Sequence, residues 1–391
     1  MKKFSKLLVL LLVVVLVTSM SILLTACNPD EQQPAPTPTE IKNPGDFIKN
    51  ADGTVTFMDW NNKVHNSMPS GKNKIINLWP ANTSTFFGIG AGGKLLATSI
   101  QTAPWVEFFY PEIDDRGEDF VIKGGTSVTA EALIAYQPDL VIVHPSNGAA
   151  LQEQLIAASI DSIYLNFKDF AGMQAVYKVL GALLGGEYET KLNLWCDKVD
   201  ETKAKIKAKT DLLSDAERPV VLYCTGIGPK KNDATVTEFS SMGANSIFQD
   251  WCEIAGGKYY LAEYASGLGG ASSINREFVL QNWPDIILCA GAKQNQTYDT
   301  LMTNDTYADK LGSTKIVRNP YVLFDIARFG FEALLQLSQA VSVIQPSIAA
   351  ELGINMNAEI KNFYKTFSGK TLTDAQVQLI IDGRKPNGQP F

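Results

Sequence analysis

Histidine, the side chain that most often acts as a general base in catalysis, is scarce in this sequence. It contains two histidines, His65 and His144, and neither belongs to a Gly-x-Ser-x-Gly or His-Glu-x-x-His motif. With only two histidines, a bare-metal site built from several imidazoles is excluded, and we expect His65 to lie at the surface of an N-terminal hairpin. Asp and Glu together number 41. Paired-acid chemistry therefore stays open, and a secreted carboxylate-based hydrolase is one alternative.

One cysteine stands in a pattern with known chemistry. Cys27 ends the run Leu24-Thr-Ala-Cys, which follows a basic start at residues 1–6 and an almost entirely apolar segment at residues 7–24. This pattern resembles the bacterial lipobox, in which the signal peptide, here residues 1–26, is removed and the cysteine is lipidated. The alternative is an uncleaved transmembrane anchor, because the apolar segment is long enough to span a bilayer.

The residues that follow Cys27 have the composition of a tether. Residues 28–44 are Pro-rich, polar and without apolar periodicity. We therefore expect residues 27–45 to be a flexible, solvated linker. A lipid anchor followed by a tether predicts a protein held at the extracytoplasmic face of the cell membrane.

The remaining cysteines and the net charge of the chain argue against a zinc or redox motif and against nucleic acid as a partner. Cys224 and Cys289 each close an apolar run, so they are either buried thiols or a disulfide between neighbouring strands. With Cys196 and Cys252 they lack the C-x-x-C spacing of zinc or redox motifs. The formal net charge is −7, and there is no basic run interleaved with aromatics. Nucleic acid is therefore not an expected partner.

A long amphipathic helix is predicted over residues 187–213. Its apolar residues recur at intervals of three, four or seven, and Glu187 with Lys191, like Glu201 with Lys205, stands at i,i+4 with the acid first. The stripe comprises Tyr188, Leu192, Trp195, Val199 and Ile206. Neither Gly nor Pro interrupts the segment, so we interpret it as a strut between two lobes.

A repeated unit flanks this helix. Glu131 and Glu277 each begin a short helix, a Pro-Asp pair follows seven residues later, and an all-apolar run comes next. The repeat implies two α/β lobes of related plan, at residues 46–186 and 214–391.

The remaining segments fit this plan. The glycine cluster at residues 88–93 follows a helix and precedes a strand, the reverse of a phosphate-binding loop, so we expect a tight turn. Residues 101–115 form a loop rich in aromatics, which either pack beneath it or face a ligand. Further strands are expected near residues 54–60, 63–65, 74–79, 94–98, 120–122, 140–144, 160–165, 219–224, 286–289, 315–317 and 321–324, and further helices near 81–87, 151–158, 246–255, 331–344 and 361–383.

Together these features resemble the helical-backbone class of ABC-importer substrate-binding proteins. The resemblance rests on the two Glu...Pro-Asp repeats, the strut and four short motifs, and it covers almost all of residues 53–383. The motifs are Ile75-Ile-Asn-Leu-Trp-Pro80, Gly88-Ile-Gly-Ala-Gly92, Ala255-Gly-Gly257 and Asn362-Phe-Tyr-Lys-Thr-Phe367 with Leu372-Thr-Asp.

The resemblance implies an α/β fold of two Rossmann-like lobes joined by one long helix, with a ligand cleft between the lobes. It implies a monomeric receptor, not an enzyme, with no cofactor, that captures an iron complex such as a ferric siderophore or a haem-like chelate and delivers it to an ABC permease. Cobalamin or a molybdate- or tungstate-type oxyanion is the alternative cargo.

The resemblance also implies roles for particular residues. Glu131 and Glu277 match the acids that meet arginines of the permease, although the helix dipole alone favours an acid at either position. Ligand contacts are implied at strand ends, for Trp79, Trp105, His144, Tyr223 and Arg328. Three of these residues have an alternative role. Trp79 could instead belong to the core, Arg328 could instead form an ion pair with Asp325, and His144 could instead bond to its neighbours. No residue is implied as a metal ligand.

Overall fold

The computed structural model describes residues 41–99, 105, 108, 120–122, 128–144, 147–267, 271–291, 293–318 and 330–389. Residues 1–42 and 43–391 form separate units, and the account below concerns the second. The predicted signal peptide, Cys27, most of the tether and Arg328 lie outside the described residues. Within the described part of the chain, no helix is both long enough and apolar enough to span a bilayer.

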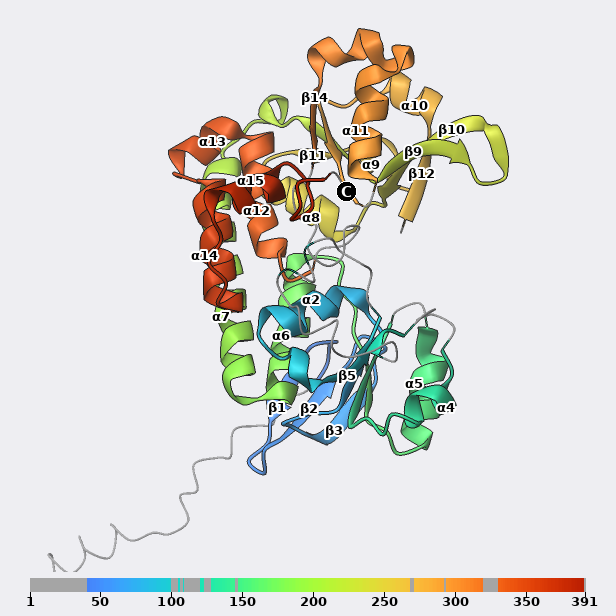
Figure 1. Cartoon of the computed structure of the whole chain (residues 1–391), viewed down its shortest axis with the longest axis vertical. Coiled ribbons are helices and arrows are strands. Elements are labelled where there is room, and N and C mark those ends of the chain that lie inside the picture. The colour runs from blue at the N-terminus through green and yellow to red at the C-terminus, as the bar shows by residue number, and fades with distance from the viewer. Residues whose placement is uncertain are drawn as a thin grey trace, which may run out of the picture. The chain divides into compact units, whose positions relative to one another are not determined.

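The first lobe is built on a parallel sheet of order β5-β4-β6-β7. Along β6, Leu140 and Ile142 belong to the main core, whereas Val141 and Val143 face a second apolar cluster with residues of α4 and α5. Burial on both faces is what the all-apolar sequence of this strand predicts. The elements are β4 (Ile75–Asn77), α2 (Pro80–Gly88), β5 (Leu95–Thr98), α4 (Ala130–Ile134), β6 (Leu140–Val143), α5 (Gly148–Ala157) and β7 (Ser162–Tyr164) (Figure 1).

The second lobe repeats this plan with a parallel sheet of order β11-β8-β13-β14. The two sheets confirm the predicted α/β fold with two lobes. The elements are β8 (Val220–Cys224), α8 (Ile247–Ile254), β11 (Lys258–Tyr259), α9 (Tyr260–Tyr264), α10 (Arg276–Gln281), β13 (Ile286–Cys289), α11 (Gln294–Thr303), η6 (Asp305–Ser313) and β14 (Lys315–Arg318).

The long helix is α7, Gly186–Thr210, which packs on α6 (Phe170–Leu184) and on α8 and α12 (Ala333–Ile344). Leu192, Trp195, Val199 and Ile206 are buried as the stripe requires. Both predicted i,i+4 pairs form salt bridges, with N···O distances of 2.6 Å for Lys205–Glu201 and 3.7 Å for Lys191–Glu187. After α12 the chain forms α13 (Pro346–Glu351), α14 (Met356–Ser368) and α15 (Asp374–Ile381).

The aspartate of each Pro-Asp pair ties the start of its strand, β6 or β13, to the start of the neighbouring strand, β4 or β8. Asp139 accepts hydrogen bonds from the backbone N–H groups of Asn73 and Lys74, at 2.8 and 3.0 Å. Asp285 accepts one from the backbone N–H of Val220, at 2.8 Å. Both carboxylates thus satisfy amides at a strand start that would otherwise lack partners. The repeat therefore has a structural basis as well as a sequence one.

Two small antiparallel sheets complete the fold. The predicted N-terminal hairpin is present, with β1 (Phe47–Lys49), β2 (Thr54–Met58) and β3 (Val64–Pro69), and Asn62 in its turn has φ 59°. A second sheet, of order β12-β10-β9, was not predicted; its strands are β9 (Gly226–Lys230), β10 (Asp233–Met242) and β12 (Ala271–Asn275). The strand predicted at residues 120–122 is wrong, because only a single bridge joins Val121 to Thr98.

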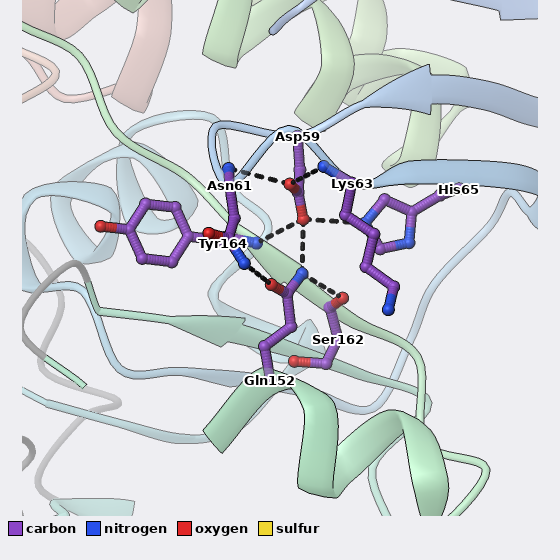
Figure 2. A network of polar contacts seen from close by, with 7 residues as sticks. All are labelled: Asp59, Asn61, Lys63, His65, Gln152, Ser162 and Tyr164. Carbon is purple, nitrogen blue, oxygen red and sulfur yellow. Dashed lines mark hydrogen bonds and ion pairs between the residues drawn. The ribbon is translucent and has the colours of Figure 1, made fainter. Parts of the chain in front are cut away.

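A buried carboxylate holds the hairpin to the first lobe (Figure 2). Asp59 has no exposed surface and accepts from His65 Nε2 at 2.8 Å and from the Gln152 side-chain amide. It also accepts from the backbone N–H groups of Asn61, Lys63 and Tyr164, at 2.9, 3.1 and 3.2 Å. The surface position expected for His65 is therefore wrong, because its ring is buried against this carboxylate.

The four described cysteines are free and buried. Cys224 and Cys289 lie directly opposite each other on β8 and β13, so they are neighbours but remain thiols. Burial raises the pKa of Cys196 and of Cys224 to about 12, and it raises the pKa of Cys252 and of Cys289 well above the ordinary value.

Candidate functional site

A pocket of about 450 Å³ opens beside the carboxyl end of β14, lined by Asn295, Asp299, Arg318, Asp382 and Arg384. Ligands of open α/β sheets bind outside the carboxyl ends of the strands, so this is the expected place for a site. The volume is also in the range of small-molecule sites. Two arginines and two aspartates make the lining polar and electrically balanced.

Arg318 is the last residue of β14, and its guanidinium contacts two residues of α11. Its guanidinium carbon lies 3.7 Å from the centre of the Tyr298 ring, a cation–π contact. Its Nη2 lies 3.5 Å from Asp299 Oδ1. Among the described residues none accepts a hydrogen bond from its buried Nε–H. The fork is thus oriented by the Tyr298 face, with donors available to an acidic ligand group.

Arg384 reaches the same pocket from the C-terminal tail. After α15 the chain turns back, and Asn295 Nδ2 donates to the carbonyl of Gly383 at 3.4 Å. Trp105 Nε1 donates to the carbonyl of Arg384 at 2.8 Å. Trp105 belongs to the segment after the first-lobe strand β5 and is only 1% exposed. This hydrogen bond therefore joins the first lobe to the edge of the pocket.

The other predicted ligand residues lie deeper. Trp79 precedes α2, is buried, and has its ring centre 4.8 Å from that of Phe167. Tyr223 is inside β8 and its ring packs 4.1 Å from that of Phe248, within the core and not at an open strand end. His144 directly follows β6 and is also mostly buried. None of these three lines the pocket beside β14.

The chain just after the segment that contains Arg328 is anchored across the lobes. The Phe331 backbone N–H donates to Ser84 Oγ at 3.0 Å, and Trp195 Nε1 donates to the Phe331 carbonyl at 2.8 Å. A Cβ on Gly330 would come within 2.4 Å of Ser84 Oγ, and one on Gly88 within 2.4 Å of the Phe331 ring. The close approach of residues 330–331 to α2 explains both glycines.

Glu332, next in sequence, gives the fold a pH dependence that can be measured. It is 8% exposed, and burial raises its pKa to about 7 from 4.5. The folded state therefore holds a proton that the unfolded chain releases between pH 4.5 and 7, so stability falls as the pH rises through this window. We expect a loss of roughly 1–3 kcal/mol in unfolding free energy by pH 8.

Urea denaturation of Glu332→Gln and wild type between pH 5 and 8 checks this expectation. The variant should lose less stability than the wild type over the range, because its side chain does not titrate. Glu351→Gln, at an exposed position of α13, is the control. Identical pH profiles for Glu332→Gln and wild type would contradict the assignment.

The two acids predicted to dock on a permease occupy matching positions. Glu131 and Glu277 are each the second residue of their helix, α4 and α10, and both are exposed. The helices are capped by Thr129 and Asn275, whose side chains accept from the Ala132 and Glu277 backbone N–H groups. Only the second acid has a salt-bridge partner in the described chain: Arg276 donates to Glu277 at 2.9 and 3.2 Å and lowers the pKa of its carboxyl.

The described residues contain no group of three or more His, Cys, Asp or Glu side chains placed to hold a metal ion. The pocket instead offers guanidinium donors and carboxylate acceptors, which bind a ligand through its polar groups and not through a bare metal.

Sequence reasoning missed both arginines of the pocket. Arg318 did carry a signal, because it directly follows the apolar run Ile316-Val at the end of a predicted strand. Arg384 carried none, because the return of the tail to the sheet edge depends on tertiary contacts with Asn295 and Trp105.

Residues 75–318 match the family model described as periplasmic binding protein. A curated protein, described as an uncharacterized ABC transporter substrate-binding lipoprotein YvrC of Bacillus subtilis, is 28% identical over 155 residues, 38% of this chain. That alignment spans just under half, 46%, of the relative's length.

Solved structures share the fold. A periplasmic solute binding protein from Veillonella parvula superposes with a TM-score of 0.63 at 18% identity, covering 88% of this chain and 98% of the other. The molybdate periplasmic binding protein MolA of Haemophilus influenzae, bound to molybdate, gives 0.63 at 14% identity, covering 81% and 99%.

Proposed function

Because the chain belongs to the periplasmic binding protein family, we propose that it is the solute receptor of an ABC importer and binds an anionic metal chelate of the ferric siderophore type. The observation that carries the ligand class is the pocket of about 450 Å³ beside β14, with Arg318 and Arg384 in its lining. Guanidinium forks recognise carboxylate and similar acidic groups in pairs of hydrogen bonds.

The balance of charges in the pocket favours a chelate over a small oxyanion. Asp299 and Asp382 lie in the same lining as the two arginines. They would repel a compact anion, whereas a larger ligand can place acceptors at the arginines and hydroxyl or amide donors at the aspartates. A molybdate-type oxyanion or cobalamin remains the alternative cargo, and the fold shared with a molybdate-bound protein supports testing the oxyanion.

The remaining parts of the proposal follow from the sequence. Cys27 would carry the lipid anchor, residues 27–45 would tether the lobes to the extracytoplasmic face of the membrane, and the receptor would act as a monomer. Residues 46–186 and 214–391 would form the lobes on either side of the connecting helix. Trp79, Trp105, His144, Tyr223 and Arg328 stay proposals as ligand contacts, as do Glu131 and Glu277 as docking residues. A hydrolase is the less favoured alternative.

A ligand screen on the fragment beginning after Cys27 tests the proposal. The panel holds ferric chelates of catecholate, hydroxamate and citrate types, haem, cobalamin, molybdate and tungstate, with oligosaccharides as controls for an enzyme. A ligand that binds only the native state stabilises it by about 2.7 kcal/mol at a hundred times its dissociation constant. A saturable thermal shift with one chelate supports the proposal, whereas turnover of an oligosaccharide without any shift would favour the hydrolase.

Arg318→Gln is expected to weaken binding of an acidic chelate about tenfold or more, because charge-assisted hydrogen bonds to the ligand are lost. Titration calorimetry of wild type and variant measures the change. Lys310→Gln, at a partly exposed position of η6 before β14, is the control. An unchanged dissociation constant in Arg318→Gln would place the ligand elsewhere.

A further inference from the structure

The C-terminal tail is a folded segment with its own hydrogen bonds. The Arg384 backbone N–H donates to the Leu379 carbonyl at 2.8 Å, and the Lys385 N–H donates to the Gln389 carbonyl at 2.8 Å. Gly383 has φ 63°, and a Cβ there would meet the Gln294 amide at 3.3 Å. The path of residues 382–389 is therefore set by the chain's own contacts. We call these residues the C-terminal strap.

The strap is attached to both lobes. On the second lobe, Asn295 Nδ2 donates to the Gly383 carbonyl at 3.4 Å. On the first lobe, Trp105 Nε1 donates to the Arg384 carbonyl at 2.8 Å. Trp105 is buried, so its indole is a fixed attachment point. The strap thus spans from one lobe to the other at the edge of the pocket.

Arg384 lines this pocket from the strap. Its Nη1 donates to the Gly388 carbonyl at 3.0 Å, which holds the guanidinium in place within the turn. A guanidinium has five N–H donors, so most of them remain for a ligand. Arg318 lines the same pocket from the end of β14. Two arginines from segments far apart in sequence therefore meet at one site.

We propose that the C-terminal strap is a wall of the ligand site, with Arg384 binding an acidic group of the ligand and Trp105 holding the strap in place. The proposal rests on the proposed receptor function and adds a specificity-determining residue to it. The strap would select ligands that carry at least two separated acidic groups, one for each arginine.

Affinity measurements on Arg384→Gln test the role of the guanidinium. The probes are ferric citrate and a ferric catecholate, which are acidic, and a ferric hydroxamate without acidic groups. We expect the affinity for an acidic probe that binds wild type to fall about tenfold and the response to the hydroxamate to stay unchanged. Lys385→Gln, on the same turn and also exposed but outside the pocket lining, is the matched control and should change the affinity less than twofold.

Limited trypsin digestion tests the attachment without any ligand. Cleavage after Arg384 releases residues 385–391, which mass spectrometry detects. Trp105→Phe keeps the ring but removes the hydrogen bond, so cleavage should speed up about fivefold, as expected for one hydrogen bond. Trp283→Phe removes an indole hydrogen bond to Thr314 elsewhere and should leave the rate unchanged.

The outcomes separate the two proposals. If wild type binds an acidic chelate and Arg384→Gln binds it equally well, the strap proposal is overturned and the receptor function stands. If wild type binds none of the acidic probes, the proposed ligand class and the role of Arg384 are both overturned. Unchanged cleavage in Trp105→Phe would overturn the attachment by Trp105.

Discussion

Reversing Glu131 and Glu277 together to lysine is expected to abolish uptake while leaving ligand affinity unchanged. Both carboxylates are exposed at the second position of helices with the same place in their lobes, α4 and α10. Neither belongs to the pocket beside β14. If each meets an arginine of the permease, lysine replaces an attraction by a repulsion, and losing even one such pair costs about 2–5 kcal/mol.

Uptake of radiolabelled ligand in cells that depend on this receptor is the measurement. Each single reversal should lower the uptake rate by about thirtyfold or more, and the double reversal should lower it to background. Glu153→Lys and Glu263→Lys reverse exposed acids on α5 and α9 and serve as controls, one for each lobe. Normal uptake by the double variant, or a loss of ligand affinity in it, would refute the docking assignment.

Glu277 should behave differently from Glu131 in such an assay. Its carboxylate already accepts two hydrogen bonds from Arg276, which an incoming permease arginine must share or replace. Docking through the second lobe would then begin from a carboxylate that is already paired. The single reversal at Glu131 is therefore expected to have the larger effect of the two.

Asp59→Ala is expected to cause the largest loss of stability of any single substitution considered. The carboxylate accepts five hydrogen bonds, from two side chains and three backbone amides of the first lobe. Removing it leaves the buried His65 Nε2 without its acceptor and leaves the Gln152 amide with the Ser162 carbonyl alone. Breaking a buried pair in this way costs about 3–5 kcal/mol. Urea denaturation at pH 7 measures the difference from wild type.

The control for this prediction is Asp52→Ala. Asp52 is exposed and accepts two hydrogen bonds from Thr54 in a hairpin turn, so its loss should cost much less stability than the loss of Asp59. Similar losses for the two variants would mean that the buried network stabilises the lobe no more than an ordinary turn does.

The same carboxylate predicts a pH dependence opposite in sign to that of Glu332. Burial acts to raise the pKa of Asp59, but the hydrogen bonds from His65 and Gln152 outweigh it and hold the pKa below its ordinary value. Its contribution is therefore present above the unfolded pKa of about 3.9 and is lost as the pH falls through the lower folded value. Asp59→Asn should remove this part of the acid sensitivity.

Much of the architecture could be predicted because the pattern that specifies it is local. The stripe from Leu192 to Ile206 recurs at helical spacing, and the Pro-Asp pairs mark the start of β6 and β13. Helix α6 escaped prediction because it is buried almost all round and so shows no polar face. The β9–β10–β12 sheet escaped because its strands pair across gaps of up to about thirty residues and carry polar side chains.

The candidate site was harder to predict than the fold. Tyr223 stands one residue from the end of its strand, yet its side chain turns into the core against Phe248, since alternate residues of a strand face opposite sides. Strand ends identify the right edge of a sheet, but not which side chains point outward there. The tail contributes Arg384 to the pocket only because α14 and α15 direct the chain back to it, and no short sequence motif encodes that path.

The burial of Cys196, Cys224, Cys252 and Cys289 makes the protein suited to site-directed labelling. Maleimides react with thiolates. The pKa is about 12 for Cys196 and Cys224 and well above the ordinary value for Cys252 and Cys289, so almost no thiolate is present at pH 7. A fragment beginning after Cys27 therefore needs no native thiol replaced among the described residues. Cysteines introduced at exposed positions, one in each lobe, would take fluorophores selectively. Energy transfer between the two fluorophores would then report the distance between the lobes during ligand capture.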